Sequence, residues 1–281
     1  MARPFRRLSV ALWPLLALVF ACDEITALPP GSQPFVPPPE YRLWWSMTEA
    51  CSGLHGSFSS IDWYVVPGTT ALPGTHGEYQ GEWFVQGNRI SLASAKEFDG
   101  SLVRHEMLHA LLGVNGHPRS QFLDRCAGTV VCVEECMQDA GPFSGPPAGT
   151  PIVPASALQI GVELEPTHAS AETDDGYFAL VVSAHNPADH AVVAQLPRYG
   201  NDNLGVSFSY RMGTDDKDSV GTFVLAYDPQ AVFFRPGETK HQVFDMRIGE
   251  EYEGNIEPGN YIAVGGFANH NSAALPITVS P

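Results

Sequence analysis

The residues of this chain whose types and spacing suit chemistry lie between Val103 and Gly113. His105 and His109 are four residues apart, and Glu106 directly follows the first of them. In a helix this spacing places both imidazoles one turn apart on one face, where both can bind a single metal ion. Glu106 then lies beside the ion, where a general base can act on a bound water. The segment therefore predicts a metal site with an adjacent base.

The residues around this pair predict the helix that must position it. Apolar side chains fill most of the other positions, and Gly113 is a natural helix end: Leu102, Val103, Met107, Leu108, Ala110, Leu111 and Leu112. The alternative is a buried helix with two core histidines and no metal. A glutamate buried between them would then be costly to desolvate, which favours the metal site.

The His-Glu-x-x-His pattern resembles that of the zincin zinc peptidases, in which three protein ligands hold zinc and water takes a fourth position. In metzincins a glycine follows the second histidine by three residues and a third histidine follows by six. Here Gly113 is four residues on and His117 eight on. The resemblance implies Zn²⁺ on His105, His109 and His117, a metzincin-like site with a displaced third ligand. Three other candidates for the third ligand stay open: Glu134, Glu135 and Asp124.

The same resemblance implies an activity, the hydrolysis of peptide bonds in a peptide or protein substrate. Zinc would lower the pKa of its water and polarise the scissile carbonyl, while Glu106 accepts the water proton and passes it to the leaving amine. The alternative is a cell-surface binding protein whose zincin-like site is structural or inactive. A purely structural site has no use for a general base, so the presence of Glu106 favours the peptidase.

An α+β zincin-like domain is expected over residues 41–140, with the active-site helix packed on a small mixed sheet. Its predicted elements are a helix at Tyr41 to Cys51, strands at Ile61 to Val66, Trp83 to Val85 and Arg89 to Ala93, and the His-Glu-x-x-His helix from near Gly100. In zincins the edge strand before the active-site helix binds substrate by strand addition. The resemblance gives this place to Arg89 to Ala93.

A second domain is expected over residues 155–281, after a Pro/Gly linker at 141–154. Repeated short β-like runs with turn residues between them predict an all-β sandwich. These runs are Leu158 to Leu164, Tyr177 to Ser183, His190 to Leu196, Gly205 to Tyr210, Thr222 to Tyr227, Val232 to Phe234, Gln242 to Ile248, Tyr261 to Val264 and Ile277 to Val279. The turns at 236–238 and 257–261 resemble those of bacterial immunoglobulin-like modules.

The cysteines and the N-terminus predict export. Arg3, Arg6 and Arg7 precede an apolar run, so residues 1–21 are expected to be a signal peptide. Cys22 then follows a small residue as in bacterial lipoproteins, which predicts lipidation, with ordinary secretion as the alternative. Residues 22–40 are rich in proline and predict an extended stalk from a membrane anchor in the periplasm or at the cell surface.

Four further cysteines, an even number in an oxidising compartment, predict two disulfides with three possible connectivities: Cys51, Cys126, Cys132 and Cys136. Cys51 with Cys126 and Cys132 with Cys136 is the pairing we expect. A rival interpretation makes the last three cysteines zinc ligands, but the paired histidines and the predicted export favour disulfides.

The charge of the chain argues against one class of partner. Without residues 1–21 it holds 12 Lys and Arg against 31 Asp and Glu, a formal charge of 12 − 31 = −19. Such a surface repels nucleic acid and anionic lipid headgroups. We therefore expect no nucleic-acid partner, and membrane association only through the lipid anchor.

Overall fold

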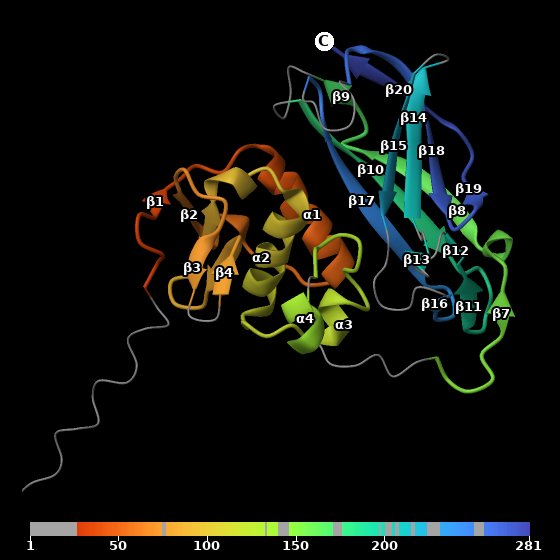
Figure 1. Ribbon diagram of the computed structural model, residues 1–281, viewed down its shortest axis with the longest axis horizontal. Coiled ribbons are helices and arrows are strands. Elements are labelled where there is room, and N and C mark those ends of the chain that lie inside the picture. Colours follow the sequence, from red (N-terminus) through yellow and green to blue (C-terminus); the bar gives the residue numbers. More distant parts are fainter. Residues whose placement is uncertain are drawn as a thin grey trace, which may run out of the picture.

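The computed structural model describes residues 27–74, 77–132, 134–139, 146–170, 176–196, 198–199, 204–205, 208–214, 217–223, 231–249 and 256–281. Within them, a portion with mixed helices and strands comes first and a portion built of strands follows (Figure 1). This order agrees with the expected α+β domain and later β domain. The predicted signal peptide and Cys22 lie outside the described residues.

A four-stranded sheet forms one layer of the first portion. Its order is β1 (Gln33–Pro34), β2 (Asp62–Val66), β6 (Arg89–Ala93) and β5 (Gly81–Phe84). β2 and β6 run parallel, whereas β5 is antiparallel to β6. β3 (Leu72–Gly74) and β4 (Gly77–Tyr79) make a separate antiparallel pair. The expectation that Arg89 to Ala93 is an edge strand is therefore wrong: β6 lies between β2 and β5, because the tight turn after Phe84 folds β5 onto its outer side.

Two helices of thirteen residues pack together against this sheet, α1 (Glu40–Ser52) and α2 (Gly100–Leu112). α1 buries residues at helical spacing, namely Tyr41, Trp44, Trp45 and Thr48. It ends at Gly53, whose φ of 70° gives the left-handed cap that glycine adopts without strain. The shorter helical segments are η1 (Phe58–Ser60), η2 (Ser94–Lys96), α3 (Arg119–Phe122) and α4 (Glu134–Asp139).

Both proline-rich segments contribute strands to the fold. Gln33 and Pro34 pair with β2, and the Phe35 amide donates to the carbonyl of Trp63 at 3.0 Å. The predicted stalk therefore does not extend to residue 40, because its last residues complete the sheet and lead into α1. In the predicted linker, β7 (Ile152–Val153) pairs in parallel with β11 (Val192–Gln195). Residues 141–145 of that linker lie outside the described part.

The second portion is a sandwich of sheets. One sheet holds β17 (Thr239–Arg247), β10 (Tyr177–His185) and β8 (Gln159–Glu165). A separate three-stranded sheet has the order β16 (Ala231–Phe234), β11 and β7. The facing sheet holds β15 (Lys217–Phe223), β14 (Phe208–Thr214), β18 (Gly259–Phe267), β20 (Leu275–Ser280) and β9 (Ala169–Ser170), with β19 (His270–Asn271) on β18. The remaining elements are η3 (Ala155–Ala157), β12 (Arg198–Tyr199) and β13 (Leu204–Gly205). Phe178 and Leu180 of β10 pack on Met212, Ala263 and Ile277 of the opposite sheet.

The predicted strands of this portion lie where strands are found, but several observed strands are longer than predicted. β10 and β17 run to nine residues each, longer than the expected runs, and β14 continues four residues beyond Tyr210. The expected strand at Thr222 to Tyr227 overlaps β15 only at Thr222 and Phe223, and residues 224–230 lie outside the described part.

The two portions share a hydrophobic core. Tyr41, Trp44 and Met107 of the first portion form one buried cluster with Tyr177 and Val243 of the second. In Figure 1 β17 runs along the side of the sandwich that faces α1. The helix α2, which carries His105 and His109, therefore packs on a surface to which both portions contribute.

The described residues hold two disulfides, Cys51–Cys126 and Cys132–Cys136. This is the expected pairing, and it removes the alternative in which cysteines are metal ligands. Disulfides are typical of proteins that fold in an oxidising compartment. Among the described residues, no helix combines the length and apolar character needed to cross a membrane.

Candidate metal centre

The sequence of α2 fixes both ends of the helix that carries the first two histidines. The Asp99 carboxylate caps its start by accepting from the Leu102 amide at 3.3 Å. Gly113 ends it with a φ of 69°, and its amide donates to the His109 carbonyl at 2.8 Å. His105 and His109 therefore lie one turn apart on one face, as the spacing predicts.

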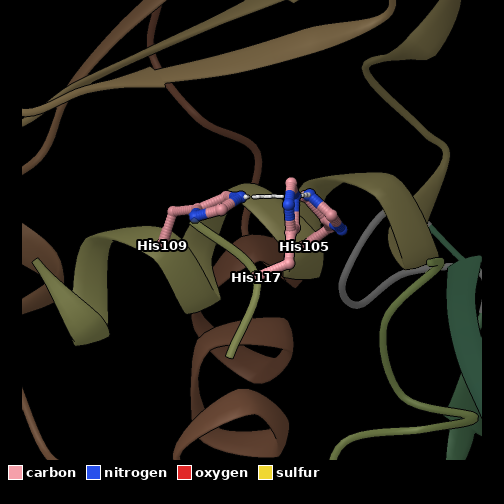
Figure 2. Close-up of side chains that lie close together, drawn as sticks. All are labelled: His105, His109 and His117. Atoms are coloured by element: carbon pink, nitrogen blue, oxygen red, sulfur yellow. Dashed lines mark hydrogen bonds between the residues drawn. The ribbon is translucent and has the colours of Figure 1, made fainter. Parts of the chain in front are cut away.

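Three histidine side chains converge at this face (Figure 2). The Nε2 atom of His109 lies 3.1 Å from that of His105 and 3.2 Å from that of His117, and the third side of the triangle is 3.2 Å. Nitrogens bound to one tetrahedral zinc about 2.0–2.1 Å away would lie about 3.3–3.4 Å apart. Gly113 and His117 follow His109 by more residues than in metzincins, and the chain still brings the imidazole of His117 to the other two.

Each histidine uses its other ring nitrogen to hold its orientation. The Nδ1 of His105 donates to the Val131 carbonyl at 2.7 Å, and that of His109 to the Val114 carbonyl at 2.9 Å. The Nδ1 of His117 lies 3.0 Å from Oδ2 of Asp139, which also accepts from the His117 amide at 2.7 Å. Such outer partners fix the tautomer, so Nε2 is the atom left for a metal.

The electrostatics of the cluster favour a bound cation. Burial, followed by the neighbouring histidines, lowers the pKa of His105 to about 3, and burial lowers that of His109 to about 4. Both rings are therefore neutral near pH 7, and carbonyls already hold their Nδ1 protons. Their two Nε2 lone pairs then face each other at 3.1 Å with no proton between them. A metal ion satisfies both, so the residues present fit a metal.

A phenylalanine forms the floor of the cluster. Phe122 is fully buried, and its ring centroid lies 4.9 Å from the ring centroids of His105, His109 and His117 alike. It rests on a cluster that contains Leu108 and both disulfides. Nothing in the sequence pattern singled out Phe122, because its place depends on α3 folding back under α2.

Glu106 lies between α2 and the edge strand β5. It is 4% exposed, and a Cβ on Gly81 would come within 3.2 Å of its Cγ, so a larger residue at position 81 would press on the Glu106 side chain. Burial, followed by the charge of Glu82, raises the pKa of Glu106 to about 8, while a hydrogen bond from the Trp83 backbone opposes the rise. The Trp83 ring lies parallel to that of His109, at an interplanar angle of 3°.

The other candidates for the third ligand do not join the cluster. Asp124 lies 3.7 Å from Arg119 and 3.3 Å from Arg235, which makes it part of an ion-pair network instead. That alternative is therefore wrong. The side chains of Glu134 and Glu135 lie outside the described part of the structure. Within the described residues, the three histidines are the one group of metal-ligating side chains close enough to share an ion.

Comparisons with known proteins assign no family to the chain. No protein-family model matches it, and no curated protein matches it. Among solved structures, the DNA glycosylase AlkC of Pseudomonas fluorescens, bound to DNA with an abasic site analog, has a TM-score of 0.30 and 10% identity over 44% of this chain and 31% of its own. A β-glucosidase from Listeria innocua has a TM-score of 0.25 and 12% identity over 44% of this chain and 16% of its own.

A β-glucosidase from Bifidobacterium adolescentis is similar at the same level, with a TM-score of 0.24 and 16% identity over 43% of this chain and 17% of its own. The chain thus spans less than a third of the length of these proteins. Likeness this weak assigns neither a fold family nor an activity, and the functional argument rests on the site.

Proposed function

We propose that this protein is an exported zinc-dependent endopeptidase of the zincin class. The observation that carries the proposal is the triangle of three Nε2 atoms, with sides of 3.1–3.2 Å. Two of its histidines lie on α2, the helix that also places Glu106 next to His105. Three histidines with their Nδ1 atoms held from behind are the ligand set of a catalytic zinc, which keeps a fourth position open. In this proposal the β portion is an immunoglobulin-like sandwich that supports α2.

Zinc at this site would supply a water of lowered pKa and would polarise a peptide carbonyl. Glu106 is the residue that moves protons. Its carboxylate is buried beside β5 with its pKa raised to about 8, which suits a group that must take up a proton and release it near neutral pH. The hydrogen bond from the Trp83 backbone holds the carboxylate in place while it does so.

The edge strand β5 is the surface to which we assign the substrate. The Ala93 amide donates to the Gln80 carbonyl at 2.9 Å, and this bond sets the alternation of the β5–β6 pair. The backbone groups of Gly81 and Trp83 consequently point away from β6; the Trp83 amide donates to Glu106, and the Gly81 groups and the Trp83 carbonyl face the open edge. An extended peptide could add there as a strand, next to Glu106, so the substrate we propose is an unfolded or extended polypeptide.

Purified protein loaded with zinc should cleave a denatured protein substrate, and the Glu106→Gln variant should keep its zinc but lose cleavage. Glu163→Gln, an exposed carboxylate on β8, is the matched control and should cleave as the wild type does. Cleavage that survives Glu106→Gln would refute the assigned base. Zinc binding without any cleavage by the wild type would favour the alternative, a surface binding protein with a structural metal.

The proposal also includes a lipid anchor at Cys22, based on the apolar N-terminal run and the cysteine after Ala21. Expressed in a bacterium, the protein should partition into the membrane fraction, and Cys22→Ser should release it into the soluble exported fraction. A wild-type chain found entirely in the soluble fraction would contradict the anchor and favour ordinary secretion.

A further inference from the structure

We propose that the Cys132–Cys136 disulfide positions Asp139, the group that holds His117 from behind, by tying its helix to the segment that holds His105, so that the metal site is complete only in the oxidised chain. The inference rests on the proposed metal site but not on peptidase activity. It makes Asp139 and the two cysteines positioning residues, since none of them contacts the metal position directly.

One end of the disulfide is next to the acceptor of His105. Cys132 directly follows Val131, whose carbonyl accepts from His105 Nδ1 at 2.7 Å. The Val131 amide in turn donates to the carbonyl of Ser101 at 3.1 Å, in the first turn of α2. The chain just before Cys132 is thus bonded to the metal-site helix at two points, and Cys132 has a fixed place.

The other end of the disulfide lies in the helix that holds His117. Cys136 and Asp139 are three residues apart in α4, and Asp139 Oδ2 accepts from both the amide and Nδ1 of His117. α4 has only six residues, too few for a helix to be stable by itself in water. The bond from Cys136 to Cys132 therefore ties this short helix, and with it Asp139, to the fixed end beside Val131.

Burial supports this role for Cys136. It is 2% exposed and packs in the same cluster as Phe122, the floor of the three imidazoles. The Asp139 side chain, in contrast, is 52% exposed, so packing contributes little to its position. The hydrogen bonds to His117 and the placement of α4 are what hold it. His109 is the internal contrast, because its acceptor Val114 directly follows the end of α2 and needs no crosslink.

Reduction of the Cys132–Cys136 disulfide would release α4 from Cys132. A dithiol reductant would deliver two electrons and two protons, breaking the S–S bond to give two thiols while the reductant becomes a cyclic disulfide. Released from Cys132, α4 would no longer hold Asp139 behind His117. The chain would then bind metal weakly in a reducing compartment and tightly after export to an oxidising one.

Cobalt binding tests the inference without using activity, because Co²⁺ in a site with three nitrogen ligands absorbs visible light. The Cys132→Ala/Cys136→Ala variant should bind Co²⁺ about 10- to 100-fold more weakly than the wild type, as when an outer partner of a ligand is lost. Asp139→Ala should lose affinity in the same range, and Asp139→Asn, which keeps an acceptor oxygen, should recover part of it. Thermal unfolding confirms that each variant is folded at the assay temperature.

Combining the changes decides whether the cysteines act through Asp139. Removing the disulfide from the Asp139→Ala variant should weaken Co²⁺ binding less than removing it from the wild type. Unchanged affinity in the cysteine variant, or losses that multiply in full, would overturn this inference alone. A wild-type chain that binds no Co²⁺ would overturn the metal-site proposal together with it.

Discussion

Arg104, the residue before His105 in α2, donates two parallel hydrogen bonds of 2.8 Å each to the carboxylate of Asp245 in β17. The guanidinium is fully buried, and its Nε also donates to the Thr129 carbonyl at 2.6 Å. Tyr177 adds a hydrogen bond to the same carboxylate. The two portions of the protein are thus joined by a satisfied, buried ion pair directly beside the metal site.

Removing the acid should therefore destabilise the whole protein. Asp245→Ala leaves the Arg104 charge buried without its partner, and we expect a loss of about 3 kcal/mol in the free energy of unfolding. This is the low end for broken buried pairs, because the Asp245 side chain is 22% exposed. Chemical denaturation measures the loss. Asp189→Ala, at an exposed carboxylate of the β portion, is the control; equal stability of the two variants would contradict the role of the pair.

The same interface should weaken in acid through His241. Its Nε2 lies 2.6 Å from the Thr129 hydroxyl oxygen, and burial, followed by the charges of Arg104 and Lys240, lowers its pKa. Above the ordinary histidine pKa of about 6.5 neither the folded nor the unfolded state is protonated there, so this group adds no pH dependence. Below it the unfolded state takes up a proton that the folded state refuses, and stability falls with pH.

Unfolding free energies at pH 7 and 5.5 test this effect. Because His241 is only partly buried, we expect it to account for about 1 kcal/mol of the loss between these values. Other groups titrate as well, so the comparison is with His241→Gln, whose loss should be smaller by that amount. Equal losses in the variant and the wild type would refute the assignment.

Gly128 allows the backbone of the first portion to approach the backbone of β17 closely. Its φ is +84°, its carbonyl accepts from the Val243 amide at 2.8 Å, and an added Cβ would lie 2.0 Å from the His241 carbonyl oxygen. Only glycine fits between the segment that follows α3 and β17. The sequence gives no sign of this contact, because the two segments are more than a hundred residues apart.

Phe122 offers a test of the floor beneath the histidines. Phe122→Ala would leave a cavity under three imidazoles and should cost about 3–5 kcal/mol in unfolding free energy. It should also weaken metal binding, since the three imidazole rings lose the surface on which they rest. Phe122→Leu, which fills much of the space, should lose less of both. Metal affinity that is unchanged in Phe122→Ala would show that the floor has no part in the site.

Whether a site residue can be predicted from the sequence depends on how far apart in the chain it and its partners lie. His105, Glu106 and His109 follow from helical spacing alone, and His117 follows from the glycines that turn the chain after α2. Phe122 and the Val131 carbonyl could not be predicted, because their places depend on how α3 and the chain after it fold back on α2. Asp139 could not be predicted either, because no local pattern shows that its carboxylate lies behind His117, where it accepts from the amide and Nδ1 of that residue.

The fold shows the same division between local and distant effects. The boundaries of α1 and α2 follow from proline, aspartate and glycine at their ends, and the alternating runs of the β portion mark its strands. The edge strand was assigned wrongly, because strand order in a sheet depends on pairing that no local pattern encodes. The shared core of Trp44 and Tyr177 could not be predicted either, since an apolar residue does not reveal its partner.

The zinc content of the purified protein tests the central claim most directly, with His117→Ala as its partner measurement. Elemental analysis after dialysis should find about one zinc per wild-type chain, and far less in the variant, because two histidines hold zinc weakly. Wild-type protein without zinc, or a His117→Ala variant that retains it in full, would contradict the three-histidine metal centre.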